Sequence, residues 1–443
     1  MRRHPEANPS DGFGVRPWTG RLVQNAVALM ISAGGTAVLG VAFWGIAAHL
    51  APVAAVGRTS AEITAMILMA SLAQLSFGTI FERFLPVAGT QTRSFVARAY
   101  VMCVVFALVV TSIYAFSGLA HSFLPSSFMW RSLFILAVVF WTIFALQDSV
   151  LIGLRASKWV PVENIIFAII KLALLPVLIA TSPNQGVFLA WSAPVILTII
   201  AVNWYLFAKR IPEHEALKAP TESLPRAKEL VILAGAQYAT LLFSLLTPLI
   251  VTLVVIQRLG ALANAHYYIP ALITGSLSLF LWSVFRSFVV EAASEPHALR
   301  RHTNMAIAAM TVVLVPSVII GVIFAPYILR IFGASYVAHS TTLLRMLLLS
   351  LPLSAVSIFY SVFAWLDRHV WWMALRDLVS VVIYFGIVFS LIGRYGILSI
   401  GVASLVSSAL QGIFFLPISI RRYRLTTNYE TPQDDGPAPT PVT

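Results

Sequence analysis

Two charged side chains interrupt stretches of the chain that are otherwise apolar, and they are the first candidates for chemistry. Lys171 lies among isoleucine and leucine, and Asp148 lies in an apolar run seven residues before Arg155. A charge near the centre of a membrane-spanning helix costs about 2.5 kcal/mol or more. Lys171 could bind a diphosphate, while Asp148 orients it or relays a proton. A structural ion pair between the two side chains explains the same pattern.

Four further charged residues lie near the ends of apolar runs. They are Glu82, Arg83, Arg286 and Glu291. Arginine suits phosphate because its planar guanidinium group can donate two hydrogen bonds at once. The substrate-binding candidates are therefore Arg83, Lys171 and Arg286, and their charge partners are Asp148, Glu82 and Glu291. For both arginines the alternative is snorkelling, with the charged group held at the membrane surface.

Other kinds of chemistry have no support in the sequence. The single cysteine, Cys103, lies in an apolar run and cannot form an internal disulfide. The nine histidines avoid the middles of the apolar runs, and no Cys/His cluster suggests zinc. No hydrolase, kinase or nucleotide-binding motif is present. We therefore expect a protein that is not an enzyme and that carries no cofactor or metal.

The composition places these residues in a membrane protein. Of 443 residues, 59% are hydrophobic and only 10% are charged, whereas a soluble domain carries about 25% charged residues. The net charge is +12, but the basic residues are scattered singly, so nucleic acid is not an expected partner. The expected surroundings are membrane lipids.

Twelve runs are long and apolar enough to span a bilayer as helices, which need about 20 residues each. The predicted spans are 22–48, 60–81, 96–117, 132–153, 162–181, 187–208, 230–256, 267–290, 304–329, 341–365, 371–393 and 396–419. Alternate ends of these spans carry 22 basic residues on one side and 6 on the other, with Lys171 inside a span. This asymmetry predicts that both termini are cytoplasmic. The expected location is the inner (plasma) membrane.

The spans divide into two sets of six. The predicted domains are a tail (1–21), an N-lobe (22–208), a basic linker (209–229), a C-lobe (230–419) and a second tail (420–443) whose end is disordered. The loops after Leu154 and Leu366 are both short, basic and tryptophan-bearing. Such internal echoes are typical of transporters built from repeats.

Three groups of segments follow one another at the ends of the predicted spans. The first is Phe43–Leu50 with Pro52 and Val56-Gly57, leading to Glu82–Pro86. The second comprises Asp148–Leu151, Gly153–Arg155, Trp159–Pro161, Glu163-Asn164 and Lys171-Leu172. The third comprises Arg258–Gly260, Ala265, Tyr267–Ile269 and Glu291–Ser294. In this order, the segments resemble the oligosaccharide flippases and polysaccharide exporters of the multidrug/oligosaccharidyl-lipid/polysaccharide (MOP) exporter superfamily. The chain departs from the pattern at Trp282 and Phe285-Arg286, where the family usually has small apolar residues.

The resemblance implies an all-α membrane protein with twelve transmembrane helices in two pseudo-symmetric six-helix lobes, V-shaped around a central cavity. It further implies flipping of a polyprenyl-linked saccharide, or export of a related envelope glycan precursor, by alternating access. The expected substrate is a lipid-diphosphate-linked glycan, and glycan-assembly enzymes are possible partners.

Three other functions remain open at this point. One is a multidrug or cation exporter of the same fold, which needs unpaired acids deep in a lobe. Another is a small-solute facilitator, whose Gly/Asp/Arg-rich loop between the second and third spans does not match residues 88–94. The last is a scaffold or sensor without transport, which would have a closed, apolar lobe interface.

Overall fold

The computed structural model describes residues 38–216, 246–294, 299–366 and 370–425, and these residues are helical with short connections. The N-terminal half contains helix Val38–Leu50, α2 (Val53–Ala73), α3 (Phe77–Phe84), α4 (Thr92–Phe116), α5 (Phe128–Gly153), α6 (Trp159–Thr181), α7 (Gly186–Tyr205) and α8 (Ile211–Ala216). The C-terminal half contains helix Leu246–Leu259, α10 (Ala261–Ser294), α11 (Leu299–Ile323), α12 (Ala325–Arg330), α13 (Ala334–Leu366), α14 (Val370–Tyr395) and α15 (Leu398–Leu425).

The predicted all-α membrane fold is confirmed. Nine described helices are long and apolar enough to cross a membrane, and two shorter apolar helices, Val38–Leu50 and Leu246–Leu259, stand at the start of each half. With α10, which has 34 residues, the described residues hold twelve apolar helices. Each of them overlaps one of the twelve predicted spans.

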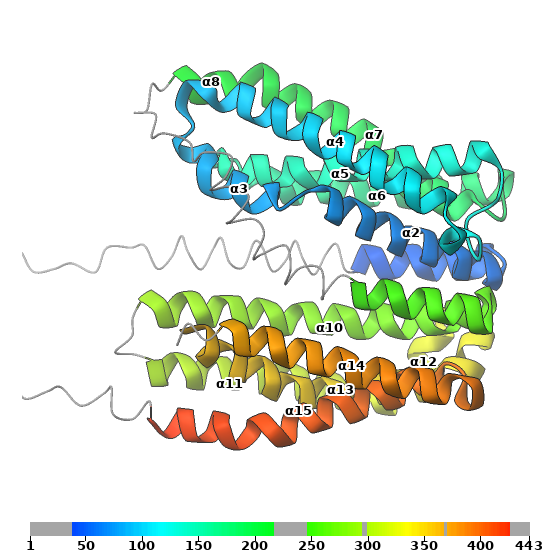
Figure 1. Ribbon diagram of the computed structural model, residues 1–443. Coiled ribbons are helices and arrows are strands. Elements are labelled where there is room, and N and C mark those ends of the chain that lie inside the picture. The colour runs from blue at the N-terminus through cyan, green and yellow to red at the C-terminus, as the bar shows by residue number, and fades with distance from the viewer. Residues whose placement is uncertain (1–37, 217–245, 295–298, 367–369, 426–443) are drawn as a thin grey trace, which may run out of the picture.

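The two halves form two lobes that meet at one end. Helices α2 to α8 lie together in the upper part of Figure 1, and α10 to α15 lie together in the lower part. The lobes contact each other where α2 packs against α10. From that contact the ribbons of the two lobes diverge toward the end where α3 and α8 lie (Figure 1).

The helices place apolar side chains on both their inner and outer faces, as expected in a bilayer. On α6 the buried residues include Phe167, Lys171 and Leu175 at intervals of four, which puts them on one face of the helix. The opposite face exposes Ile169 and Val177, which are 54% and 59% accessible in the isolated chain. In water such a face would be unfavourable, whereas in lipid it is the normal outer surface.

The predicted span 60–81 is wrong in one respect, because it is not one continuous helix. α2 ends at Ala73, and α3 begins at Phe77. Between them Leu75 and Ser76 have left-handed backbone angles, with φ of 49° and 62°. Residues other than glycine adopt this conformation at an energetic cost, which packing around the break must offset. No glycine or proline occupies positions 74–76, and the nearest glycine, Gly78, lies inside α3, so the local sequence does not predict the break.

Gly153 allows α5 to approach α3 closely. A Cβ atom at this position would lie 2.6 Å from the carbonyl oxygen of Phe81 and 3.0 Å from Leu85. Gly153→Ala should therefore lower the unfolding free energy by about 1–3 kcal/mol, as overpacking does, and lower the melting temperature in detergent. Gly40→Ala is the matched control, because nothing lies within 4 Å of its added Cβ. Equal melting temperatures for both variants would contradict the close approach.

Candidate functional site

Helices α5, α6 and α7 enclose a polar cluster in the interior of the N-lobe. Gln147 is fully buried and donates a hydrogen bond from Nε2 to Oε1 of Glu163, which is itself 5% exposed. Asn203 donates from Nδ2 to Oε1 of Gln147 at 2.7 Å. Through these two hydrogen bonds Gln147 links α5 to both α6 and α7. We call Gln147, Asp148, Glu163, Asn164 and Asn203 the N-lobe polar cluster.

The second carboxylate of the cluster is held more loosely. Asn164 contacts Oδ2 of Asp148 at 3.4 Å and donates to the carbonyl oxygen of Val160 at 2.9 Å. The other oxygens, Oδ1 of Asp148 and Oε2 of Glu163, are buried and have no hydrogen-bond partner among the described residues. A buried carboxylate without partners is costly as an anion. The cluster therefore has open acceptor positions that a proton or a small cation could fill.

The donor set does not suggest a resident divalent metal. Within the described ranges no three His, Cys, Asp or Glu side chains lie together as metal ligands would. Two carboxylates and amide oxygens suit a proton or a monovalent cation better than Ca²⁺, which takes six to eight oxygen ligands.

An aromatic layer lies directly beyond the polar cluster. The rings of Phe144 and Phe167 are 5.2 Å apart, and Trp141 lies 5.8 Å from Phe167. Phe144 is about one turn along α5 from Asp148, and Phe167 is one turn along α6 from Glu163. Because α5 and α6 run in opposite directions, these rings separate the polar cluster from the side chain one turn further along α6.

That next side chain is Lys171, and it lies in an aromatic box. Its Nζ is 3.7 Å from the ring centroid of Trp191, 4.9 Å from that of Phe167 and 5.3 Å from that of Phe43. The lysine is only 5% exposed. Aromatic faces attract cations, and this attraction strengthens where water is excluded. Within the described part of the chain, no carboxylate forms an ion pair with this ammonium group.

The aromatic box continues to the interface between the lobes. Phe43 precedes Trp44 in helix Val38–Leu50, and Trp44 lies 4.7 Å from Tyr268 of α10, measured between ring centroids. Lys171 is therefore separated from the C-lobe by a short series of aromatic contacts.

The predicted pairing of Asp148 with Lys171 is wrong. α6 begins at Trp159 rather than near residue 162, so Lys171 lies about 18 Å along its helix. α5 ends at Gly153, so Asp148 lies only about 8 Å from that end. The two charges differ in depth by about 10 Å, with the Phe144–Phe167 layer between them. Asp148 contacts Asn164 instead.

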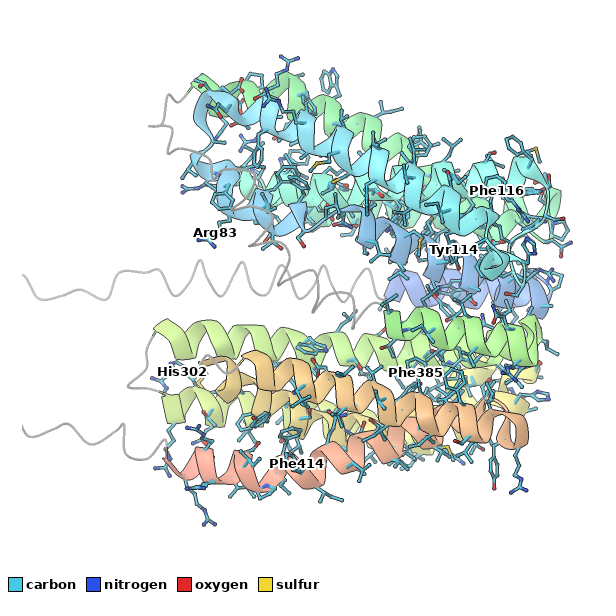
Figure 2. The ribbon with its side chains drawn as sticks, in the orientation of Figure 1. Arg83, Tyr114, Phe116, His302, Phe385 and Phe414 are labelled. Atoms are coloured by element: carbon cyan, nitrogen blue, oxygen red, sulfur yellow. The ribbon has the colours of Figure 1, made fainter. Side chains whose placement is uncertain are left out.

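Two other predicted site residues, Arg83 and Glu82, lie on α3 and outside this site. Arg83 is exposed in the last turn of α3, with its guanidinium group 5.3 Å from the ring of Phe84. Figure 2 shows it at the end of the N-lobe opposite Tyr114 and Phe116, on the side toward the C-lobe. Glu82 is also exposed and lies 3.5 Å from Ser149 Oγ. Arg286 and Glu291 are on α10, but their side chains lie outside the described part of the structure.

Sequence reasoning missed Gln147, Glu163 and Asn203 as members of one site. Glu163 and Asn164 stand out as a polar pair in an apolar helix, and Gln147 is adjacent to Asp148. The sequence does contain a signal for this site, because three consecutive predicted spans each carry a carboxamide or carboxylate near one end. These three ends are predicted to lie on the same side of the membrane, and each polar residue is within about two turns of its end.

Comparisons with known proteins establish the fold. No family model matches the chain, and no curated protein matches it. A MATE family multidrug resistance transporter of the MOP superfamily in its inward-facing conformation superposes with a TM-score of 0.69 at 13% identity, covering 89% of this chain and 96% of that one. The outward-facing conformation of a MATE family transporter of that superfamily gives 0.57 at 14% identity, covering 92% and 96%.

A third structure is a MOP superfamily transporter from Pyrococcus furiosus, described as having a binding pocket of reverse polarity that suggests a different function. It superposes with a TM-score of 0.59 at 15% identity and covers 92% of this chain and 96% of its own. The chain therefore has the two-lobed fold of MOP superfamily transporters.

Proposed function

We propose that this chain is an alternating-access membrane exporter whose cargo is an anionic lipid-linked saccharide. The observation that carries the proposal is the isolated charge of Lys171. A buried ammonium group with no carboxylate partner among the described residues lowers the stability of the N-lobe. A buried charge that lowers stability is retained where it has a function, and the positive charge of Lys171 favours binding of an anion.

The position of Lys171 fits this role. The aromatic box leads from its ammonium group through Phe43 and Trp44 to Tyr268 of the other lobe. A cargo bound between the lobes would thus come within reach of Lys171 when these rings move apart. The low dielectric around the aromatic side chains strengthens the attraction between the ammonium group and a phosphate. The flat rings also suit stacking against sugars or a prenyl chain.

The proposed orientation follows the charge asymmetry of the sequence. The end with α3 and α8 faces the cytoplasm, and the α2–α10 contact closes the outer end. Cargo would then enter from the inner leaflet and leave after the lobes separate at α2 and α10. The lipid diphosphate is the group that Lys171 recognises, and glycan-assembly enzymes on the cytoplasmic side would supply the cargo.

The test is transport by the purified protein in vesicles that contain a fluorescent polyprenyl-diphosphate sugar. Lys171→Met should lower the rate of cargo transfer at least about tenfold, which corresponds to about 1.4 kcal/mol of lost binding. The same variant should melt at an equal or higher temperature, because it removes a buried unpaired charge. Lys171→Arg should keep part of the activity, and Lys209→Met, which changes an exposed lysine, should keep all of it.

Loss of transport together with loss of thermal stability would mean that Lys171 is structural. Undiminished transfer by Lys171→Met would remove it from the site and reject the proposal.

The second candidate function is export of cationic drugs driven by a proton or cation gradient. It is favoured by the unpartnered carboxylate oxygens of Asp148 and Glu163. In that case vesicles should expel a cationic dye when a proton gradient is applied, and Glu163→Gln should abolish the expulsion. Lys171→Met should then increase dye transport, because it removes a repelling charge. The opposite responses of the two cargos to Lys171→Met distinguish the two functions.

A further inference from the structure

A basic pocket lies at the α3–α8 end of the N-lobe, apart from the polar cluster and the aromatic box. It has a volume of about 550 Å³ and is lined by the loop between α5 and α6 and by the segment from Arg210 to Ala216. Figure 1 places α8 and α3 together at this end. Its charged and titratable lining residues are Arg155, Arg210, Glu213 and His214. None of them takes part in the proposed transport site.

The nitrogen atoms around this pocket are incompletely satisfied. Arg210 donates to Glu213 Oε2 at 2.8 Å and to the carbonyl oxygen of Leu154 at 3.2 Å. Its Nε atom and Nε2 of His214 are buried and have no hydrogen-bond partner among the described residues. Arg155 is exposed, and its guanidinium group forms neither a hydrogen bond nor an ion pair with another described residue, although its backbone N–H donates to the carbonyl oxygen of Ile152 at 3.0 Å. The pocket therefore has donors for an anion beyond the one carboxylate that Arg210 already binds.

Two irregular backbone segments shape the pocket. Arg155 has a φ of 54°, the left-handed conformation that glycine usually supplies just after a helix. On the other side, residues Leu206–Arg210 form a π-helical segment before α8. π-Helical turns are rare and occur frequently at functional sites. An arginine in a conformation that favours glycine is retained at a cost, and a role for its side chain explains that cost.

Aromatic side chains show at which depth the pocket lies. Trp159 begins α6 four residues after Arg155, and it contacts Tyr205, which precedes the π-helical segment, at 5.2 Å between ring centroids. Trp159 and Trp204 are 41% and 73% exposed. Exposed tryptophan and tyrosine gather at the level of the lipid headgroups. The pocket therefore lies at headgroup level, where the phosphate of a lipid can reach it.

We propose that this pocket binds the phosphate group of an anionic lipid in the adjacent leaflet. Arg155 contributes an unpaired guanidinium group, and Arg210 and His214 contribute N–H groups directed to the same phosphate. Glu213 keeps Arg210 in place and sets a limit on the negative charge that the pocket accepts. The inference does not depend on the identity of the transported cargo.

The test measures how added lipid changes the melting temperature of the full-length protein in detergent. Phosphatidylglycerol should raise the melting temperature saturably, as a ligand of the native state does, whereas phosphatidylcholine should not. Arg155→Gly should weaken the apparent affinity for phosphatidylglycerol on the order of tenfold, because a charge-assisted hydrogen bond is lost. This variant should fold well, since glycine adopts the left-handed conformation freely.

Lys158→Gln is the matched control, because Lys158 is an exposed cation of the same loop that does not line the pocket. It should change the affinity less than about twofold, as expected for an exposed charge. Equal weakening by both variants would show diffuse attraction to the membrane and overturn the pocket. Stabilisation by inorganic phosphate that excludes any further effect of phosphatidylglycerol would assign the pocket to a soluble phosphate and overturn the lipid as its occupant.

Discussion

Replacing Gly57 by alanine should lower transport on the order of 100-fold, because it prevents the two lobes from closing at the α2–α10 contact. A Cβ at this position would lie 1.8 Å from the carbonyl oxygen of Ala261 and 2.9 Å from the backbone nitrogen of Ala265. No real contact is that short, so α2 and α10 must separate. Each ~1.4 kcal/mol by which closure is weakened lowers the population of the closed form about tenfold.

Closure at this contact also depends on buried hydrogen bonds. Asn264 of α10 donates from Nδ2 to the carbonyl oxygen of Gly57 at 2.8 Å and to Ser60 Oγ at 3.1 Å. Separation of the helices exposes Ser60, which is fully buried in the closed form. A cysteine placed at Ser60 should therefore react with an impermeant maleimide in the Gly57→Ala background and be protected without it. The native Cys103 is buried.

Gly275→Ala is the matched control for this experiment. Gly275 lies on α10, but nothing lies within 4 Å of an added Cβ at that position. Alanine favours a helix over glycine by about 1 kcal/mol, so the control should retain transport and melt at the same or a higher temperature. If Gly57→Ala retains full transport and the thiol of Ser60→Cys stays protected in that background, closure through the α2–α10 contact is rejected.

The second large effect concerns the N-lobe polar cluster. Gln147→Leu should lower the unfolding free energy by about 2–4 kcal/mol, because Glu163 then has no described hydrogen-bond donor and remains buried. Asn203 also loses its contact with Gln147. The measurement is denaturant unfolding in detergent micelles, followed by circular dichroism.

Replacing both partners should largely cancel this loss. In Gln147→Leu/Glu163→Leu no buried carboxylate remains at position 163, and a pair of apolar groups can be nearly neutral in place of a hydrogen-bonded pair. Thr142→Val is the control, because Thr142 is also fully buried on α5 but bonds only to the carbonyl oxygen of Val138. It should cost about 1 kcal/mol or less. If the double variant is less stable than Gln147→Leu, the two side chains do not act as a pair.

Hydropathy and charge placed most of the secondary structure correctly. Each predicted span overlaps a described helix, because the requirement for about 20 apolar residues is a property of the local sequence. The break between α2 and α3 is the exception. Neither Leu75 nor Ser76 favours a positive φ by itself, so their left-handed conformation depends on packing of the surrounding helices.

The amino-acid sequence by itself determined an all-helical membrane fold, the twelve apolar segments and the presence of Lys171 and Asp148 within two of the N-terminal ones. Only the tertiary structure decided which side chains meet. A three-residue difference in where α6 begins moves Lys171 by about 4.5 Å along the helix, and this contributes to placing the Phe144–Phe167 layer between the two charges. Contacts between helices depend on their axial offset and rotation, and the periodicity of a single helix specifies neither.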